Sequence, residues 1–305
     1  MRLFEDPNYQ FISNRKIGYI ISSVLLVLSI AAILLKGLSY GIDFNGGIEV
    51  VVEFEEAASV SEVRSLLTTA LGAQPEVKQF GLSRDLLVRT DVDMEISMLQ
   101  RTVLESLNEA FPNNPSVIIK SDVVGPRFAE DLKRGALYAV IFSLVVIFLY
   151  ILIRFRNFGY SVGTVGAITH DVIIIMGVFT LLNEVMPFAL DIDQTIIAAF
   201  LTIVGYSLND TVVVFDRIRE NSLIYKTMGY EEMVNKSINN TLSRTVITSL
   251  TTLFVVVVLF IFGGEVLKGF AFALMIGIVL GTYSTLYIAC PLLVDLKTKG
   301  IATTK

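Results

Sequence analysis

Six long apolar stretches dominate this chain of 305 residues and leave few folds open to it. A helix needs about 20 apolar residues to cross the hydrocarbon core of a bilayer. Only 17% of the residues are charged, whereas a soluble domain carries about 25%. The sequence therefore predicts a polytopic α-helical membrane protein. The six predicted spans are Ile17–Leu35, Gly135–Ile153, Tyr160–Leu182, Thr195–Phe215, Thr245–Phe262 and Phe270–Val294.

The first apolar stretch could be mistaken for a signal peptide, because it follows Arg15 and Lys16 near the start of the chain. Its apolar run is too long for the central region of a signal peptide, and no clean small-residue cleavage site follows it. We predict an uncleaved first span.

Basic residues gather in alternate loops, which predicts the orientation in the membrane. They precede the first span, follow the second, separate the fourth from the fifth and follow the sixth, whereas residues 183–193 have none. We expect both termini in the cytoplasm and residues 37–130 on the outer side of the membrane. The expected divisions are 1–36 (N-terminus and first helix), 37–130 (exported domain), 131–296 (helices two to six, with a cytoplasmic loop at 216–243) and 297–305 (cytoplasmic tail).

The exported segment has a pattern of its own. It predicts strands at Ile48–Phe54, Glu76–Gly81, Asp85–Thr90 and Ser116–Val124, and helices at Ser59–Leu71 and Met94–Phe111. Ser59 occupies the position of a helix cap. The order βαββαβ is that of a ferredoxin-like α+β domain inserted between helices one and two.

In the cytoplasmic loop at 216–243, the spacing of apolar residues predicts an amphipathic helix lying near the membrane surface. The residues on its apolar side are Tyr225, Met228, Tyr230, Met233 and Val234.

Charged side chains inside the predicted spans are the strongest functional signal. Asp210 lies in an apolar run, where a charge costs at least roughly 2.5 to 3.5 kcal/mol and usually marks ion chemistry. Arg244 opens the next, antiparallel span, so contact between the two is feasible. A nearby cation favours the ionised acid, whereas removal from water favours the neutral one. An Asp whose cation partner moves away would take up a proton. The alternatives are a static ion pair or an Arg that extends to the surface.

His170 and Asp171 form a second polar pair, at the middle of the third span. Asp171 is a candidate member of the same polar network, and His170, the only histidine, can titrate near neutral pH. Neighbouring residues on a helix project about 100° apart, so the two need not face the same path. Asn209 can orient Asp210 or serve only for packing.

Two groups of glycines in the sequence have different predicted roles. Gly205, Gly277 and Gly281 are small residues of the kind that lets membrane helices approach closely. The second group, Gly41, Asp43, Gly46 and Gly47, lies just after the first span and is typical of a loop with an Asx turn leading into a strand.

Several classes of function are not indicated. The only cysteine, Cys290, lies in an apolar run and has the pattern of a small core residue. The net charge of -5 argues against a nucleic-acid-binding protein. We find no metal-ligand cluster, no phosphate-binding glycine loop and no nucleophile–base set, so neither a cofactor nor an enzyme is expected.

Taken together, these motifs resemble those of the SecF members of the SecD/SecF family, in the resistance-nodulation-division superfamily. The resemblance covers nearly the whole chain and is carried by Gly41–Gly47, Val124–Pro126, His170–Asp171, Gly205–Asn221, Ser243–Thr252 and Gly281–Ser284. It implies a complex with SecD, association with the SecYEG channel and with YajC, and use of the proton-motive force to help draw preproteins outward late in translocation.

The same resemblance implies that Asp210 and Arg244 take part in proton coupling, in a protein surrounded by membrane lipids. The match of Asp171 to the family's residues is looser. It also implies that the larger, substrate-grasping exterior domain belongs to SecD. Two other functions remain open. One is a non-transporting scaffold of the translocon, and the other is half of a proton-driven exporter of small molecules or lipids.

Overall fold

A computed structural model describes residues 7–298 and divides them into two compact units. The helical unit comprises residues 7–38, 138–181 and 196–298, and the domain unit comprises residues 39–137 and 182–195. The first six residues, and all of the predicted tail at 297–305 except its first two residues, lie outside the described part.

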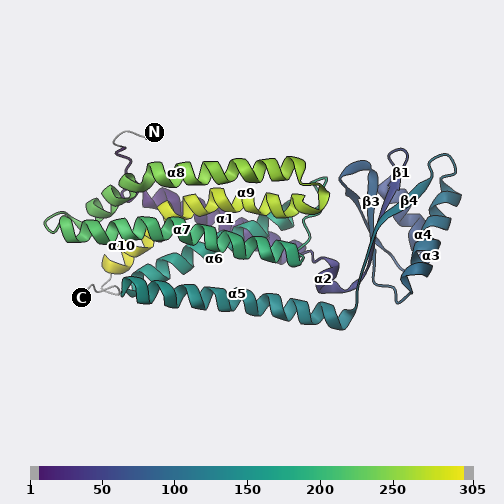
Figure 1. Ribbon diagram of the computed structural model, residues 1–305, viewed down its shortest axis with the longest axis horizontal. Coiled ribbons are helices and arrows are strands. Elements are labelled where there is room, and N and C mark those ends of the chain that lie inside the picture. The colour runs from purple at the N-terminus through teal and green to yellow at the C-terminus, as the bar shows by residue number, and fades with distance from the viewer. Residues whose placement is uncertain (1–6, 299–305) are drawn as a thin grey trace. The chain divides into compact units, whose positions relative to one another are not determined.

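Six stretches of helix within residues 7–298 are long and apolar enough to cross a membrane. This confirms the predicted polytopic fold class. Three of the helices run well beyond the predicted spans, because polar turns continue the apolar ones. The elements are α1 (Arg15–Lys36), α5 (Pro126–Phe155), α6 (Phe158–Leu182), α7 (Gln194–Ile224), α8 (Tyr230–Phe262) and α9 (Glu265–Ser284), the last continued by a π-helical turn (Thr285–Ala289) and α10 (Cys290–Thr298) (Figure 1).

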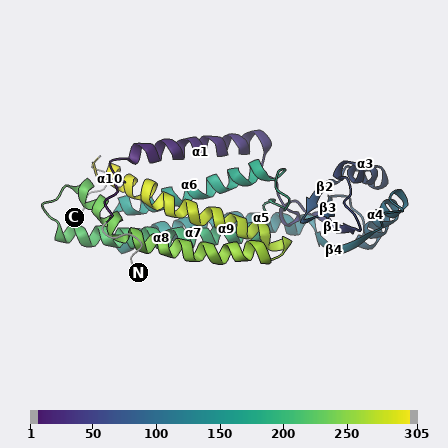
Figure 2. The same ribbon diagram turned by 90° about the horizontal axis from the view of Figure 1, so that it is seen from above.

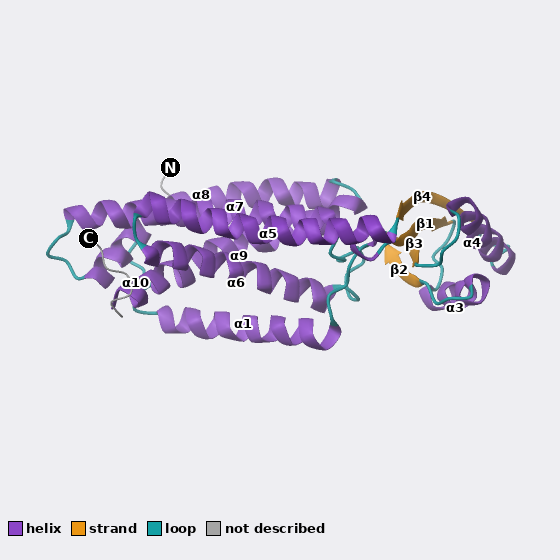
Figure 3. Ribbon diagram, turned by 90° about the horizontal axis from the view of Figure 1, so that it is seen from below, coloured by secondary structure: helices purple, strands orange, loops and turns teal. Residues whose placement is uncertain are grey.

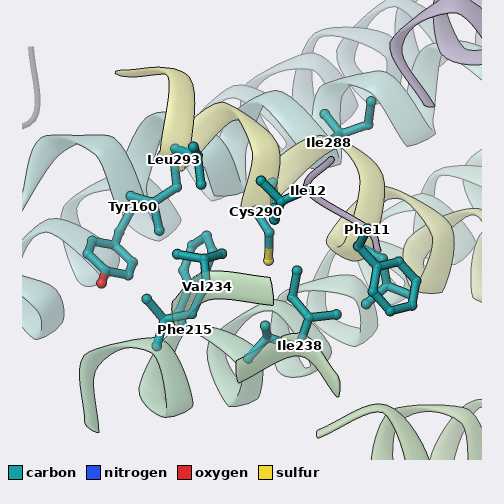
Figure 4. Packing of buried hydrophobic residues seen from close by; sticks show 14 of the residues in the cluster. Phe11, Ile12, Tyr160, Phe215, Val234, Ile238, Ile288, Cys290 and Leu293 are labelled. Carbon is teal, nitrogen blue, oxygen red and sulfur yellow. The ribbon is translucent and has the colours of Figure 1, made fainter. Parts of the chain in front are cut away.

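Within the helical unit, α8 packs along α9, and α1 lies at one side of the bundle (Figure 2). One end of the bundle holds an apolar core to which several of its helices and the segment before α1 contribute. Cys290 is fully buried in this core, which agrees with its apolar sequence context. Figure 4 labels nine members of the cluster: Phe11, Ile12, Tyr160, Phe215, Val234, Ile238, Ile288, Cys290 and Leu293.

The segment at 216–243 differs from its prediction. Instead of a separate helix on the membrane surface, it forms the end of α7, a short turn and the first part of α8. Its apolar side packs against the core of the helical unit rather than against lipid. The physical reason is the apolar cluster itself, which offers these side chains a protein partner. The packed residues are Tyr225, Met228, Tyr230, Met233 and Val234.

The domain unit contains a four-stranded antiparallel sheet in the order β2-β3-β1-β4. Figure 3 shows helices α3 and α4 on the same side of the strands. Apolar residues at alternate positions of β1, such as Val50 and Val52, are fully buried in a core with Leu67 of α3 and Val103 of α4. This is the predicted ferredoxin-like arrangement. The bounds are β1 (Gly47–Phe54), α3 (Val60–Leu71), β2 (Glu76–Phe80), β3 (Leu82–Thr90), α4 (Ile96–Ala110) and β4 (Ser116–Val124).

Ser59 lies at the N-cap position of α3, as predicted, but its side chain makes no capping bond. Its hydroxyl instead lies 2.9 Å from the hydroxyl of Ser61. The exposed start of α3 leaves both hydroxyls free to pair with each other.

The backbone conformation just before β1 requires glycine. Gly46 and Gly47 have φ of +75° and +111°, a region that favours glycine. A Cβ on Gly47 would lie 2.6 Å from the carbonyl oxygen of Thr90, so a side chain does not fit there. Between the first span and these glycines, the chain forms one short helical turn, α2 (Ile42–Asn45).

Candidate functional site

Asp210 lies on α7 with only 3% of its surface exposed. Its neighbours on the same helix are largely apolar, so the carboxylate must find polar partners on other helices. The hydroxyl of Ser249, on α8, donates to Oδ2 of Asp210 at 3.3 Å. That hydroxyl also lies 2.7 Å from the hydroxyl of Thr282, on α9. A polar chain therefore joins α7, α8 and α9 at the depth of the carboxylate.

Arg244 lies on α8, five residues before Ser249, and its side chain is exposed. It lies about 7.5 Å along α8 from Ser249, whose hydroxyl reaches Asp210. Among residues 7–298, however, no hydrogen bond or ion pair joins the two side chains. The static ion pair that the sequence left open is therefore not formed. The acid and the cation lie on consecutive helices, α7 and α8, without a direct contact.

A polar hollow of about 1120 Å³ opens beside Arg244 in the helical unit. Arg217 and Lys236 line it together with Arg244, and Glu231 and Glu232 supply opposite charge. Such a lining is suited to water. Arg244 therefore has a hydrated space beside it in which its charge is solvated.

The second predicted pair is buried and joined internally. His170 Nδ1 lies 2.9 Å from Oδ1 of Asp171, so the two residues do share one polar site. Asp171 is 1% exposed. Its Oδ2 accepts hydrogen bonds from Ser207 of α7 at 3.2 Å and from Ser284 of α9 at 2.7 Å. Asp171 thus ties three helices together.

The predicted packing glycines divide into two groups. A Cβ on Gly277 would lie 2.5 Å from Ile203, and one on Gly281 would lie 3.1 Å from Ser207, so α9 approaches α7 closely along this face. Gly205 is different, because nothing lies within 4 Å of the position of its Cβ. The interpretation of Gly205 as a close contact is wrong within this chain, since it faces away from the helices that α7 packs on.

Asn209 does not orient Asp210. Its side chain is exposed, and within the described part of the chain it forms no hydrogen bond to the acid. The reason is helical geometry, because adjacent residues project about 100° apart and Asp210 takes the buried side.

Sequence reasoning did not assign a role to Ser284 or Thr282, whose hydroxyls complete the two polar sites. Both lie one turn or less beyond the Gly277–Gly281 pair, on the face where small residues let α9 approach α7. Their place in the sequence next to these small residues was the signal that could have identified them.

The glycine-rich motif before β1 also differs from its interpretation as a plain Asx turn. The carboxylate of Asp43 accepts a hydrogen bond from the backbone N–H of Gln194, at the first residue of α7, with a distance of 3.0 Å. The motif therefore reaches the helix that carries Asp210.

Comparison with known proteins decides the family. Residues 103–299 match the model of the protein export membrane protein SecD/SecF C-terminal region, and residues 31–58 match that of the SecD/SecF GG motif. Protein translocase subunit SecF of Rhodothermus marinus is 53% identical over 302 residues, which cover 99% of this chain and 97% of the relative. The chain belongs to the SecF family. SecF of Calditerrivibrio nitroreducens is 38% identical over 296 residues, covering 96% of this chain and 95% of that protein.

The SecF fold recurs in solved structures. The crystal structure of SecDF, a translocon-associated membrane protein from Thermus thermophilus, matches 96% of this chain with a TM-score of 0.85 and 37% identity. A SecDF structure in a super-membrane-facing form matches 97% with a TM-score of 0.69 and 34% identity. This chain spans only 39% and 40% of those two chains, which are therefore much longer than this SecF-family member.

Proposed function

We propose that this SecF-family chain works with SecD to convert the proton-motive force into late-stage movement of preproteins through the SecYEG channel, with YajC as an accessory partner. The orientation that goes with this proposal has both termini in the cytoplasm and residues 37–130 outside. The observation that carries it is the setting of Asp210: a buried carboxylate with one hydroxyl donor and, on the next helix, a cation that forms no ion pair with it within residues 7–298.

The chemistry follows from that arrangement. When Arg244 approaches, its charge favours ionised Asp210; when Arg244 turns into the polar hollow, burial favours the neutral acid. Each cycle of approach and withdrawal takes up one proton at Oδ1 or Oδ2 and releases one. Ser249 and Thr282 adjust their hydrogen bonds as the charge changes, so the protonation of Asp210 biases the packing of α7 against α8 and α9.

Asp171 and His170 take a supporting part in the proposal. The Ser207 and Ser284 hydroxyls hold Oδ2 of Asp171, and the ring nitrogen of His170 lies 2.9 Å from its Oδ1. This second polar layer keeps α6, α7 and α9 in register while the contacts of Asp210 change.

The test compares Asp210→Asn with the original chain in vesicles that contain SecD and SecYEG. The amide cannot exchange a proton, so we expect assembly with SecD to be normal and the proton-dependent stimulation of preprotein export to be lost. Asn209→Ala, one residue away and exposed, is the matched control and should export as the original does. Full stimulation in Asp210→Asn would reject the proton role and leave a scaffold as the better explanation.

A further inference from the structure

The loop between α6 and α7 packs within the domain unit rather than with the helical unit, and residues 182–195 cluster with the α+β domain. Near the end of this loop lies Asp191, which is only 6% exposed. Because a buried charge is costly unless it is paired, its partners show what the loop is attached to.

Asp191 is paired with two cations on the sheet. Its Oδ1 lies 2.9 Å from Nζ of Lys78 on β2, and its Oδ2 lies 3.2 Å from Nη2 of Arg89 on β3. The hydroxyl of Ser39, just after α1, donates to the same carboxylate. Burial opposes the charge, but Lys78 and Arg89 outweigh it and hold the pKa of Asp191 below its usual value.

Arg89 extends the network across the sheet. Its Nη2 lies 2.8 Å from Glu49 on β1, and its Nη1 lies 2.9 Å from Glu76 on β2. Nη1 also donates to the backbone carbonyl of Tyr40 at 3.2 Å. One guanidinium thus binds two strands, the segment after α1 and, through Asp191, the loop before α7. Such a planar fork of donors suits several acceptors at once.

Backbone contacts fix the same junction. The N–H of Gly41 donates to the carbonyl of Ile192 at 2.9 Å, and the N–H of Ile192 donates to the carbonyl of Ser39 at 2.8 Å. Asp43 then accepts from the first backbone N–H of α7. An acid at a helix N-terminus satisfies a free donor and complements the helix dipole.

Helix α7 belongs to both units. Gln194 and Thr195 lie in the domain unit, and the rest of the helix, with Asp210, lies in the helical unit. Asp210 is about 24 Å along the helix from its first residue, at 1.5 Å per residue. No break interrupts the helix between these points, so it can transmit a displacement along its axis.

We propose that Asp191, together with Asp43, is a positioning residue that fastens the α+β domain to the first turn of α7, so that movement of α7 at Asp210 is carried to the domain. This inference rests on the proposed function, because it names the mechanical link through which the proton site would act. It assigns the glycine-rich motif a specific task, which is to connect the segment after α1 to the start of α7.

The test replaces the ionic link with a reversible covalent one. Ser39→Cys with Asp191→Cys removes the carboxylate and places two thiols at positions whose native side chains are direct hydrogen-bond partners. The only native cysteine, Cys290, is fully buried and does not compete. The full chain is assembled with SecD and SecYEG in vesicles, and proton uptake and preprotein export are measured with dithiothreitol or with a mild copper–phenanthroline oxidant.

In the reduced form we expect proton uptake to continue while export falls about five-fold, the lower end of typical coupling between sites. In the oxidised form the disulfide fastens residue 191 to the segment after α1 but does not re-form the pairs with Lys78 and Arg89, so we expect export to recover in part. The same molecules serve as their own folding control. A reduced form that exports like the original chain, or an oxidised form that exports no better than the reduced one, overturns the inference.

Two further variants complete the design. Asp191→Asn should uncouple in the same way as the reduced pair, whereas Asp122→Asn, a surface acid on β4 that pairs with Lys120, should export normally. Asp210→Asn separates the two proposals: if it retains export, the proposed function fails. If it loses export while Asp191→Asn and the reduced pair keep it, only the link fails.

Discussion

Two buried carboxylates in the helical unit have opposite surroundings. Asp171 has hydroxyl donors from two other helices and a histidine nitrogen at 2.9 Å, so several contacts fix its position. Asp210 has one hydroxyl donor at 3.3 Å, and within the described residues Arg244 forms no ion pair with it. A carboxylate with few fixed donors responds most to a moving cation. This difference is why we assign the switching role to Asp210 and a structural role to Asp171.

At the residue scale, we predict that substitutions of Arg244 follow its charge more than its shape. Arg244→Ala should abolish the proton-dependent stimulation of export, because the moving cation that favours ionised Asp210 is then gone. Arg244→Lys should retain an intermediate level, since it keeps the charge but loses the planar fork. The measurement is export in vesicles with and without a proton-motive force. A Lys variant as inactive as the Ala variant would show that a specific guanidinium contact is required.

At the scale of the elements, helix pairs differ in how closely their backbones approach each other. At Gly177 on α6, a Cβ would lie 2.2 Å from Cβ and 2.4 Å from Cα of Ser29 on α1, so backbone meets backbone there. At Gly205 on α7 the same position is open. Glycine is thus required at the first site by tertiary contact and is only tolerated at the second.

We therefore predict opposite outcomes for one chemical change at these two elements. Gly177→Ala should lower the free energy of unfolding by about 1 to 3 kcal/mol, because α1 and α6 must separate to admit the methyl group. Gly205→Ala should be neutral or stabilising by up to about 1 kcal/mol, since alanine favours helix over glycine. Thermal unfolding in detergent compares the two. Equal losses at both sites would contradict the packing described for α6.

At the scale of the whole molecule, the two units differ in their chemistry. The helical unit carries the buried acids Asp171 and Asp210, whereas the domain unit carries a sheet with a core of its own, formed together with α3 and α4. The junction of the glycine-rich motif, Asp191 and the first residues of α7 lies within the domain unit.

The orientation of the whole molecule can be tested by cysteine labelling. Gln79 and Lys226 are both exposed side chains, on β2 and on the turn between α7 and α8. In intact cells, a membrane-impermeant reagent should label Gln79→Cys but not Lys226→Cys, which should react only after the membrane is opened. Buried Cys290 keeps the background low. The reverse pattern would overturn the proposed topology.

Much of the fold was predictable from the sequence because its signals are local. Apolar runs long enough for a bilayer predicted all six spans, and the alternation of β1 together with the helical spacing of α3 and α4 predicted the βαββαβ domain. Asp210 was identifiable for the same reason, since an acid in an apolar run is conspicuous without any structure. These signals depend on composition and on the period of a helix or strand, which a chain carries within a few residues.

Only the tertiary structure decided which polar groups meet. The contacts of the Ser284 and Thr282 hydroxyls, the separation of Arg244 from Asp210, and the bond between Asp43 and Gln194 depend on helices and loops distant in sequence. The 216–243 segment was placed wrongly because its apolar side suits lipid and protein equally well. Asp191 gave no signal for a comparable reason. An acid in a loop has the sequence context of a solvent-exposed residue, and only the tertiary structure shows that two cations of the sheet pair with it.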